Sequence, residues 1–473
     1  MRRIILAALA GCLLAAPTWA GEPPIPQDPA RQERRFRDLI EWNRKTLGEA
    51  YETAGRKDPR WDKSAREALE AAARLFGRAI DPGSEEEEVY RPAKMAVDAG
   101  SDDALILYLH ARTSRTPNDP GAEESERRWT RAAAAIEKST YSPLRRAAAL
   151  TQAGLARARK KILTPDDRRE AARLLDAALE SIRRGAAKPE RGDAADDERF
   201  HTAKAIVDGH RLLLGDHKQA SDRVDTVLAK VAGLKTMRLQ LKAATLIGQA
   251  WEARGIGMGN TVTEDAGRKF EEALADAHEA LTQAWETEPK GTRTPGLMLV
   301  VLKGLGGERA DMEEWFRRAL QADGSNMGAC MTKMDWIDPK WYGSAAEVLE
   351  FGRACRATKN WRAGITLLAA DAHLRVSSRM EPEASDKYLQ SPEVWDEIRS
   401  VYEEYLAHYA TDHAARSFYA SYAYFCGRYV ESDRQFKIVG NRLVANRFVR
   451  MDLMQELRTH ASLRAKTPPP PGR

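Results

Sequence analysis

Apolar residues recur along the chain at intervals of three and four positions, within segments that are otherwise rich in alanine and charged residues. This spacing places apolar side chains on one face of a helix, so most of the chain is predicted to form amphipathic helices. Strict alternation with β-branched residues, which is typical of strands, is missing from the sequence. The predicted fold class is therefore all-α.

Short clusters of turn-forming residues separate the predicted helices. Asp58-Pro59, Thr164-Pro165 and Asp338-Pro339 each combine a helix-capping side chain with a proline, which favours a turn followed by a new helix. One long polar stretch in the interior, residues 183–200, is predicted to be a loop. The last residues, 466–473, are rich in proline and are predicted to be a disordered, extended tail.

Small and bulky residues recur at a fixed spacing in the C-terminal half. A tetratricopeptide (TPR) repeat is a helix pair of ~34 residues with small residues around a bulky one in its second helix. Two clear copies are Ala277, Leu281, Ala284 and Pro289, then Met312, Phe316, Ala319 and Gly324. Weaker matches are Ala345, Leu349 and Gly352, then Ala420, Gly427, Ser432, Phe436 and Val439, and, without a regular period, Ala171, Leu175 and Ala178. Small residues let antiparallel helices approach closely, so stacked helix pairs are expected.

These patterns predict a right-handed α-solenoid of antiparallel, TPR-like helix pairs that is irregular in the N-terminal half. The predicted divisions are a signal peptide at 1–20, an N-terminal helical region at 21–182, the polar loop at 183–200, a helical region at 201–262, a TPR-like region at 263–465, and the tail at 466–473.

One segment resembles a known family. Residues 311–355 contain Trp315-Phe316-x-x-Ala319, then Cys330, then Pro339-Lys340-Trp341-x-Gly343-Ser344. In these features the segment resembles a bacterial domain family of unknown function whose members carry degenerate TPR-like helix pairs. Residues 42–71, 96–112 and 260–274 are more loosely similar to exported relatives of the same kind. The resemblance implies a helical repeat fold and no catalytic activity.

The first twenty residues have the pattern of an export signal. Arg2 and Arg3 precede an apolar stretch at 4–16, and Ala20 ends a segment typical of a cleavage site. An alternative is a lipid anchor at Cys12, but the apolar stretch continues past Cys12, which favours cleavage near Ala20. The mature chain is then expected to be periplasmic or extracellular.

Charge and residue usage narrow the possible chemistry. The chain has 75 Lys+Arg and 70 Asp+Glu residues intermingled along its length, so a segregated basic face for nucleic acid is not expected. Beyond the signal, no segment approaches the ~18 continuous apolar residues of a membrane span. The nine histidines are scattered, so no metal, cofactor or catalytic site is predicted from them. Cys330 and Cys355 are open to two interpretations, a disulfide in an oxidising compartment or buried small hydrophobes.

The densest group of candidate side chains lies in residues 334–344. It contains Asp335, Trp336, Asp338, Trp341 and Tyr342. The two aspartates have the residue types of an acid and a base flanking a sugar, with the tryptophans as stacking platforms. In the alternative interpretation the tryptophans fill a junction between repeats and Asp338 caps a turn. Large aromatic residues at helical turns are usually core, which favours the junction.

Two functions of different class follow from the sequence. The first is an exported scaffold without catalytic activity that binds an unknown protein or peptide partner. The second is an exported α/α-toroid enzyme acting on glycans, since such folds also consist of paired helices. The repeat spacing favours the scaffold, and the overall shape of the molecule distinguishes the two. The sequence does not predict an oligomeric state.

Overall fold

The computed structural model describes residues 25–77, 86–113, 121–186, 192–255, 261–445 and 450–466. Within these ranges the regular elements are helices, and no strand occurs. Consecutive helices pack against one another as antiparallel pairs, so the chain is an all-α solenoid of TPR-like helix pairs, as the sequence predicts. The predicted signal peptide, Cys12 and most of the proline-rich tail lie outside the described residues.

The N-terminal half contains helices of very different length. They are α1 (Pro29–Arg44), the π-turn η1 (Lys45–Glu49), α2 (Ala50–Ala54), α3 (Asp62–Phe76), α4 (Glu86–Asp98), α5 (Ala104–Arg112), α6 (Ala122–Lys138), α7 (Pro143–Ala158), α8 (Pro165–Gly185), α9 (Asp193–Leu214), α10 (His217–Leu228) and α11 (Lys235–Arg254). The predicted start at Thr164 is confirmed, since its side chain and that of Asp167 form a reciprocal capping box at α8.

The C-terminal half continues the stack of pairs. Its elements are α12 (Glu264–Thr287), α13 (Arg293–Leu305), α14 (Arg309–Ala322), α15 (Met327–Trp336), α16 (Ala345–Ala357), the 3₁₀ turn η3 (Ile365–Leu367), α17 (Leu368–Ser377), α18 (Pro382–Gln390), α19 (Pro392–His408), α20 (His413–Phe425), α21 (Tyr429–Val439) and α22 (Met451–Ala465). The predicted small positions Ala284 and Ala319 are fully buried. A Cβ on Gly352 would lie 2.8 Å from the Cβ of Ala372, so α16 and α17 meet where only glycine fits.

The polar stretch at 183–200 is more helical than its composition predicts. Helix α8 continues to Gly185 and α9 begins at Asp193, so the predicted loop is too long at both ends. Asp193 and Asp196 lie in the first turn of α9, where carboxylates complement the helix dipole. Residues 187–191 lie outside the described part of the chain.

The buried apolar residues divide into clusters along the solenoid. The first runs from Leu47 to Leu241 and the second from Ala243 to Val376, with smaller clusters towards the C-terminus. Ile25 is the exception, because it belongs to the second cluster although it precedes every residue of the first. The first residue that the structure describes therefore packs against the C-terminal half.

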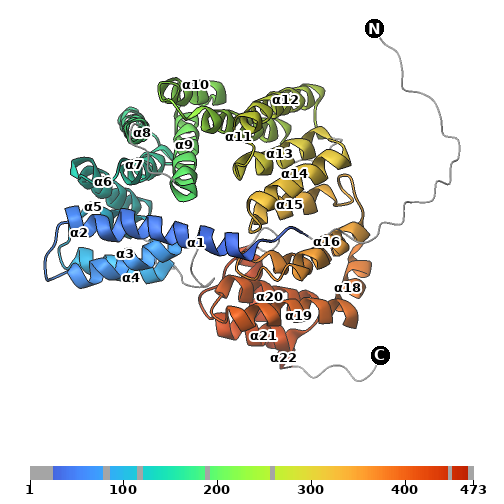
Figure 1. Cartoon of the computed structure of the whole chain (residues 1–473). Coiled ribbons are helices and arrows are strands. Elements are labelled where there is room, and N and C mark those ends of the chain that lie inside the picture. Colours follow the sequence, from blue (N-terminus) through green and yellow to red (C-terminus); the bar gives the residue numbers. More distant parts are fainter. Residues whose placement is uncertain are drawn as a thin grey trace, which may run out of the picture.

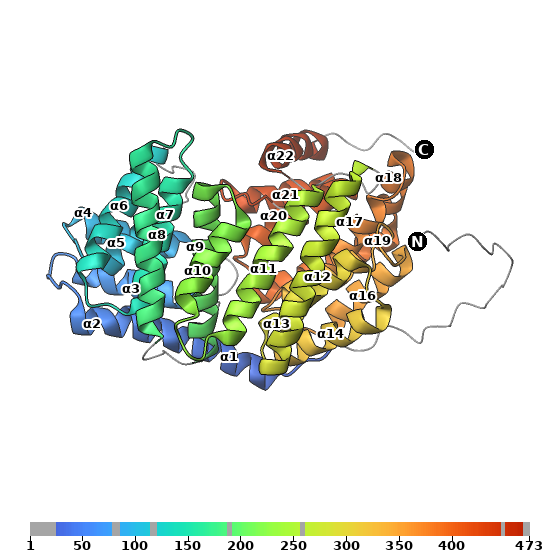
Figure 2. The same ribbon diagram turned by 90° about the horizontal axis from the view of Figure 1, so that it is seen from above.

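Figure 1 shows the helix pairs running round an arc, with α2–α4 near one end and α19–α22 near the other. Helix α1 crosses the space between them, from α2 towards α15 and α16. Viewed from above, α8–α12 stand side by side and α1 passes along their lower ends (Figure 2). We call residues 25–44, which comprise Ile25 and all of α1, the strap.

Candidate functional site

A cleft of about 510 Å³ lies between the strap and the helices that it crosses. We call it the strap cleft. Its walls come from the strap, the ends of α3 and α5, the first turns of α9, the turn between α14 and α15, and the segment before η3. The lining residues are Gln32, Arg35, Phe36, Leu39, Trp42, Asn43, Leu75, Phe76, Arg112, Ala194, Asp197, Glu198, His201, Asp323, Ser325, Met327, Arg362 and Ala363.

Helical spacing turns one face of the strap to the cleft. Asp28 caps α1 by accepting a hydrogen bond from Arg31 N, and Pro29 occupies the first turn, where its missing N–H costs nothing. Phe36, Leu39 and Trp42 then follow at intervals of three residues, which places them along one side of the helix.

Two arginines that line the cleft stack on aromatic rings. The guanidinium of Arg112 lies 4.1 Å from the ring centre of Phe76, and that of Arg362 lies 3.9 Å from the ring centre of Phe36. Arg362 also donates to the carboxylate of Glu33, at 2.9 Å. Stacking holds each guanidinium plane in place, so the cleft combines apolar ring faces with oriented cations.

A chain of ion pairs joins four parts of the solenoid beside the cleft. Arg35 of the strap lies 2.8 Å from Asp323, at the end of α14, and 3.1 Å from Asp197 of α9. Asp197 also accepts from Arg293, the first residue of α13. Burial lowers the pKa of Arg293, and the nearby Asp197 opposes that shift and keeps the group charged. The guanidinium of Arg293 stacks 4.0 Å over Phe200.

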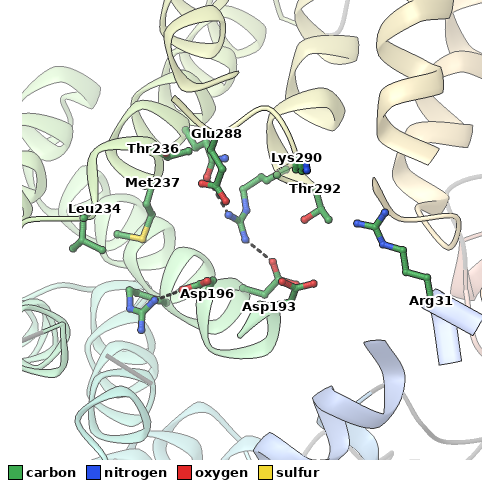
Figure 3. Close-up of a pocket in the computed structure, with 15 residues that line it drawn as sticks. Arg31, Asp193, Asp196, Leu234, Thr236, Met237, Glu288, Lys290 and Thr292 are labelled. Atoms are coloured by element: carbon green, nitrogen blue, oxygen red, sulfur yellow. Dashed lines mark hydrogen bonds and ion pairs between the residues drawn. The ribbon is translucent and has the colours of Figure 1, made fainter. Parts of the chain in front are cut away.

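A second, smaller cavity of about 190 Å³ lies on the other side of Asp197. Figure 3 shows Asp193 and Asp196 at the start of α9 on one side, with Lys290 and Thr292 from the turn before α13 nearby. Arg31 of the strap approaches from the opposite side (Figure 3). This cavity has charged walls, whereas the strap cleft has an aromatic floor.

The two aspartates that the sequence singles out lie away from both cavities. Asp335 is ion-paired with Lys303 at 3.3 Å and with Arg375 at 2.6 Å. Asp338 is almost fully buried and accepts two hydrogen bonds of 3.1 Å from Arg379. It also accepts from Lys340 N, so it caps the turn that follows α15. Both carboxylates are held by cations, which is the arrangement of a structural junction.

The aromatic residues of the same segment connect three helices. Trp336 is 2% exposed and belongs to the second core cluster. Trp341 is partly exposed and packs edge-on against Trp251 of α11, with ring centres 6.1 Å apart. Tyr342 is exposed, and its hydroxyl donates to the carbonyl of Lys303 in α13. Since Trp336 is covered, it offers no face on which a sugar ring would stack.

The cysteines are buried. Cys330 in α15 and Cys355 in α16 belong to the same apolar cluster, and Cys426 lies in another. The structure holds them as thiols, and the pairing of Cys330 with Cys355 stays a prediction for an oxidising compartment. Burial raises the pKa of Cys426 to about 12, which keeps this thiol protonated and unreactive.

Two further properties concern the described residues as a whole. None of their helices is both long enough and apolar enough to cross a bilayer. The same residues contain no cluster of three or more His, Cys, Asp or Glu side chains suited to hold a metal ion.

Sequence patterns do not indicate the strap cleft. Arg35 and Asp197 are 162 positions apart, and Gln27 lies 297 positions from its partner Gly324. Local periodicity cannot pair residues over such distances. The sequence of α1 carries one indication. It predicts an amphipathic helix with an apolar side, and this helix does not match the TPR-like repeat spacing.

No protein-family model matches the chain, and no curated protein does. Among solved structures it is similar to yeast Tom70, with 10% identity and a TM-score of 0.23 over 92% of this chain and 93% of that one. It is also similar to the TPR domain of P58(IPK), with 15% identity and a TM-score of 0.20 over 85% of this chain and 98% of that one. A circular tandem repeat protein gives 10% identity and a TM-score of 0.17 over 92% and 93%. At such low TM-scores these similarities imply nothing about function, and the fold class rests on the chain's own helix pairs.

Proposed function

We propose that this protein is an exported helical scaffold that binds a segment of a partner protein in the strap cleft. The observation that carries the proposal is the cleft itself, about 510 Å³ bounded by aromatic rings and by charged groups from distant parts of the chain. Ligand sites in proteins are commonly concave, of this size, and apolar with a few oriented polar groups. Solenoids use their curved inner surfaces in the same way.

The lining indicates the chemistry of the partner. Phe36, Trp42 and Phe76 line the cleft, and one face of each ring is covered by a stacked arginine. The remaining ring surface is apolar and suits a large apolar side chain. Arg362 and Glu198 place opposite charges at the cleft wall, suited to the carbonyl and amide groups of a peptide backbone. A polypeptide segment with one bulky apolar residue between polar ones matches both features.

Export is part of the proposal, on the evidence of the first twenty residues. A basic start, an apolar stretch and a small residue at the end are what export machinery recognises. The glycan-enzyme alternative would require Asp335 and Asp338 to face a substrate. Their ion pairs with Lys303, Arg375 and Arg379 favour a structural role.

The test is selection of peptides against the purified chain, followed by calorimetry on a variant with a filled cleft. Ala363→Trp places an indole in the cleft, where Ala363 is only partly buried. Ala407→Trp, at an exposed position of α19, adds the same side chain elsewhere. Selected peptides should bind the parent and Ala407→Trp equally and lose at least about tenfold in affinity for Ala363→Trp. Equal binding to all three would refute the cleft as the site.

A further inference from the structure

We infer that the surface on which the strap begins is itself a peptide-binding site, and that the strap is its built-in, displaceable ligand. We call this surface the strap seat. It comprises the end of α14, the turn at 323–326 and Asn360. The inference rests on the proposed function and deepens it, because it specifies where a partner segment docks and which side chains it needs.

The strap enters the seat through one apolar side chain. Ile25 is 7% exposed and packs into the second core cluster with residues from α11 to α17. Between Ile25 and Asn43 no strap residue is buried. Ile25 is therefore the anchor, in the manner of a short peptide held by a single side chain.

The seat recognises the strap through backbone carbonyls. Gln27 donates from Nε2 to the carbonyl of Gly324 at 3.1 Å, and Asn360 donates to Oε1 of Gln27 at 3.1 Å and to the carbonyl of Gly324 at 3.0 Å. Arg31 donates to the carbonyl of Gln321 at 2.8 Å. These carbonyls lie at the C-terminal end of α14, where the helix dipole favours a cation. A glutamine two residues after the anchor and an arginine four residues later thus form a specific pattern.

Gly324 lies directly against the strap. A Cβ at this position would lie 2.2 Å from Nε2 of Gln32 and 3.4 Å from the carbonyl oxygen of Pro26. Gly324 is buried under the strap. The seat is consequently shaped for a backbone that passes directly over it.

The strap buries fewer side chains than a core helix does. A helix that belongs to the core carries a stripe of buried residues, whereas Asn43 is the sole buried residue of α1. Its remaining contacts with the seat are hydrogen bonds and a partly buried ion pair between Arg35 and Asp323. A hydrogen bond within the protein replaces one to water, so each adds little net stability. At the seat, residues 25–32 of the strap are held by one apolar anchor and by polar contacts, which a competing segment with the same groups replaces.

The partner segment is accordingly a polypeptide with an aliphatic residue, a glutamine two positions later and an arginine four positions after that. Within the chain the strap is tethered, and its effective concentration at the seat is on the order of millimolar. A competing segment binds well only when the strap's own anchor is weakened or when the competitor is abundant.

The experiment uses the full chain and a fluorescent synthetic peptide of residues 22–37. In the variant Ile25→Asp the strap loses its anchor while the seat is unchanged, so the peptide should bind at least about tenfold more tightly than to the parent. Excess peptide should also accelerate tryptic cleavage after Arg31 and Arg34 in the parent, because a displaced strap is open to the protease. A peptide carrying aspartate in place of Ile25 should do neither.

Glycine variants supply the matched control. Gly324→Leu in the Ile25→Asp chain should abolish peptide binding, whereas Gly267→Leu, in α12 where a Cβ meets no atom within 4 Å, should leave it unchanged. Circular dichroism checks that each variant is folded. Failure of the peptide to bind a folded Ile25→Asp chain, or binding that survives Gly324→Leu, overturns the inference. Peptides selected for the strap cleft are measured in parallel, so a failure of the strap seat alone leaves the proposed function standing.

Discussion

Replacing Ala284 with leucine should destabilise the TPR-like region, while the same replacement at Ala275 should not. Both alanines lie in α12, but Ala284 is fully buried and Ala275 is exposed. Alanine and leucine are both good helix formers, so the change in helix propensity is small and similar at the two sites. The difference between the variants therefore measures packing alone.

The expected magnitude follows from the absence of space at Ala284. Leucine adds three heavy atoms at a position with no exposed surface, which forces neighbouring side chains or α12 itself to move. Overpacking of this kind costs about 1–3 kcal/mol. At Ala275 the added atoms extend into solvent, and the change in the free energy of unfolding should stay within about 0.5 kcal/mol.

Amide hydrogen exchange in α12 is the suitable assay, because the separate core clusters make a single unfolding transition unsafe to assume. A loss of 1–3 kcal/mol corresponds to exchange that is roughly 5- to 150-fold faster in Ala284→Leu than in the parent. Ala275→Leu should match the parent. If both variants exchange alike, the repeat register that places Ala284 at a helix contact is wrong.

Three other predictions concern separate parts of the chain. Intact-mass analysis of protein from its native envelope should show a mature chain that begins at Gly21 and carries no lipid, and a diacylglyceryl group on Cys12 would contradict this. Asp338→Asn breaks a buried ion pair and should lower the free energy of local unfolding, measured by amide hydrogen exchange in α15, by about 3–5 kcal/mol. Asp335→Asn, at a more exposed carboxylate, should cost less, and equal losses would count against the junction. Burial, helped by a nearby cation, lowers the pKa of His110 from 6.5 to about 4, so the stability that its neutral form contributes is complete above pH 6.5 and is lost as the pH falls towards 4. His110→Phe should flatten the pH dependence of unfolding in that window, and an unchanged slope would show that other groups cause it.

Features that depend on neighbouring residues could be predicted from the sequence. The cap at Thr164 needs only the three residues that follow it, and the buried positions Ala284 and Ala319 follow from helical periodicity. Composition was a poorer guide at residues 183–200, because charged residues are as compatible with the exposed face of a helix as with a loop. In this stretch α8 and α9 extend into the predicted loop from both sides.

Features that depend on distant residues could not be predicted. Asp335 and Asp338 have the residue types of an acid and base pair, and the structural interpretation rests on the ion pairs that Arg375 of α17 and Arg379, which follows it, make with them. The strap cleft is a stronger case, since it requires Arg35 to meet Asp323 and Phe36 to meet Arg362. No local pattern encodes contacts of α1 with the residue after α14 and with the segment between α16 and η3.

The strap also has a mechanical consequence. A solenoid held by contacts between successive helix pairs bends easily, because each joint adds its own compliance. A rigid rod that joins two distant points of such an arc converts bending into axial load, which an α-helix resists well. Helix α1 has 16 residues and is therefore roughly 24 Å long. Its length acts as a gauge for the radius of curvature, and inserting one helical turn would spread the arc by up to about 5 Å at that point.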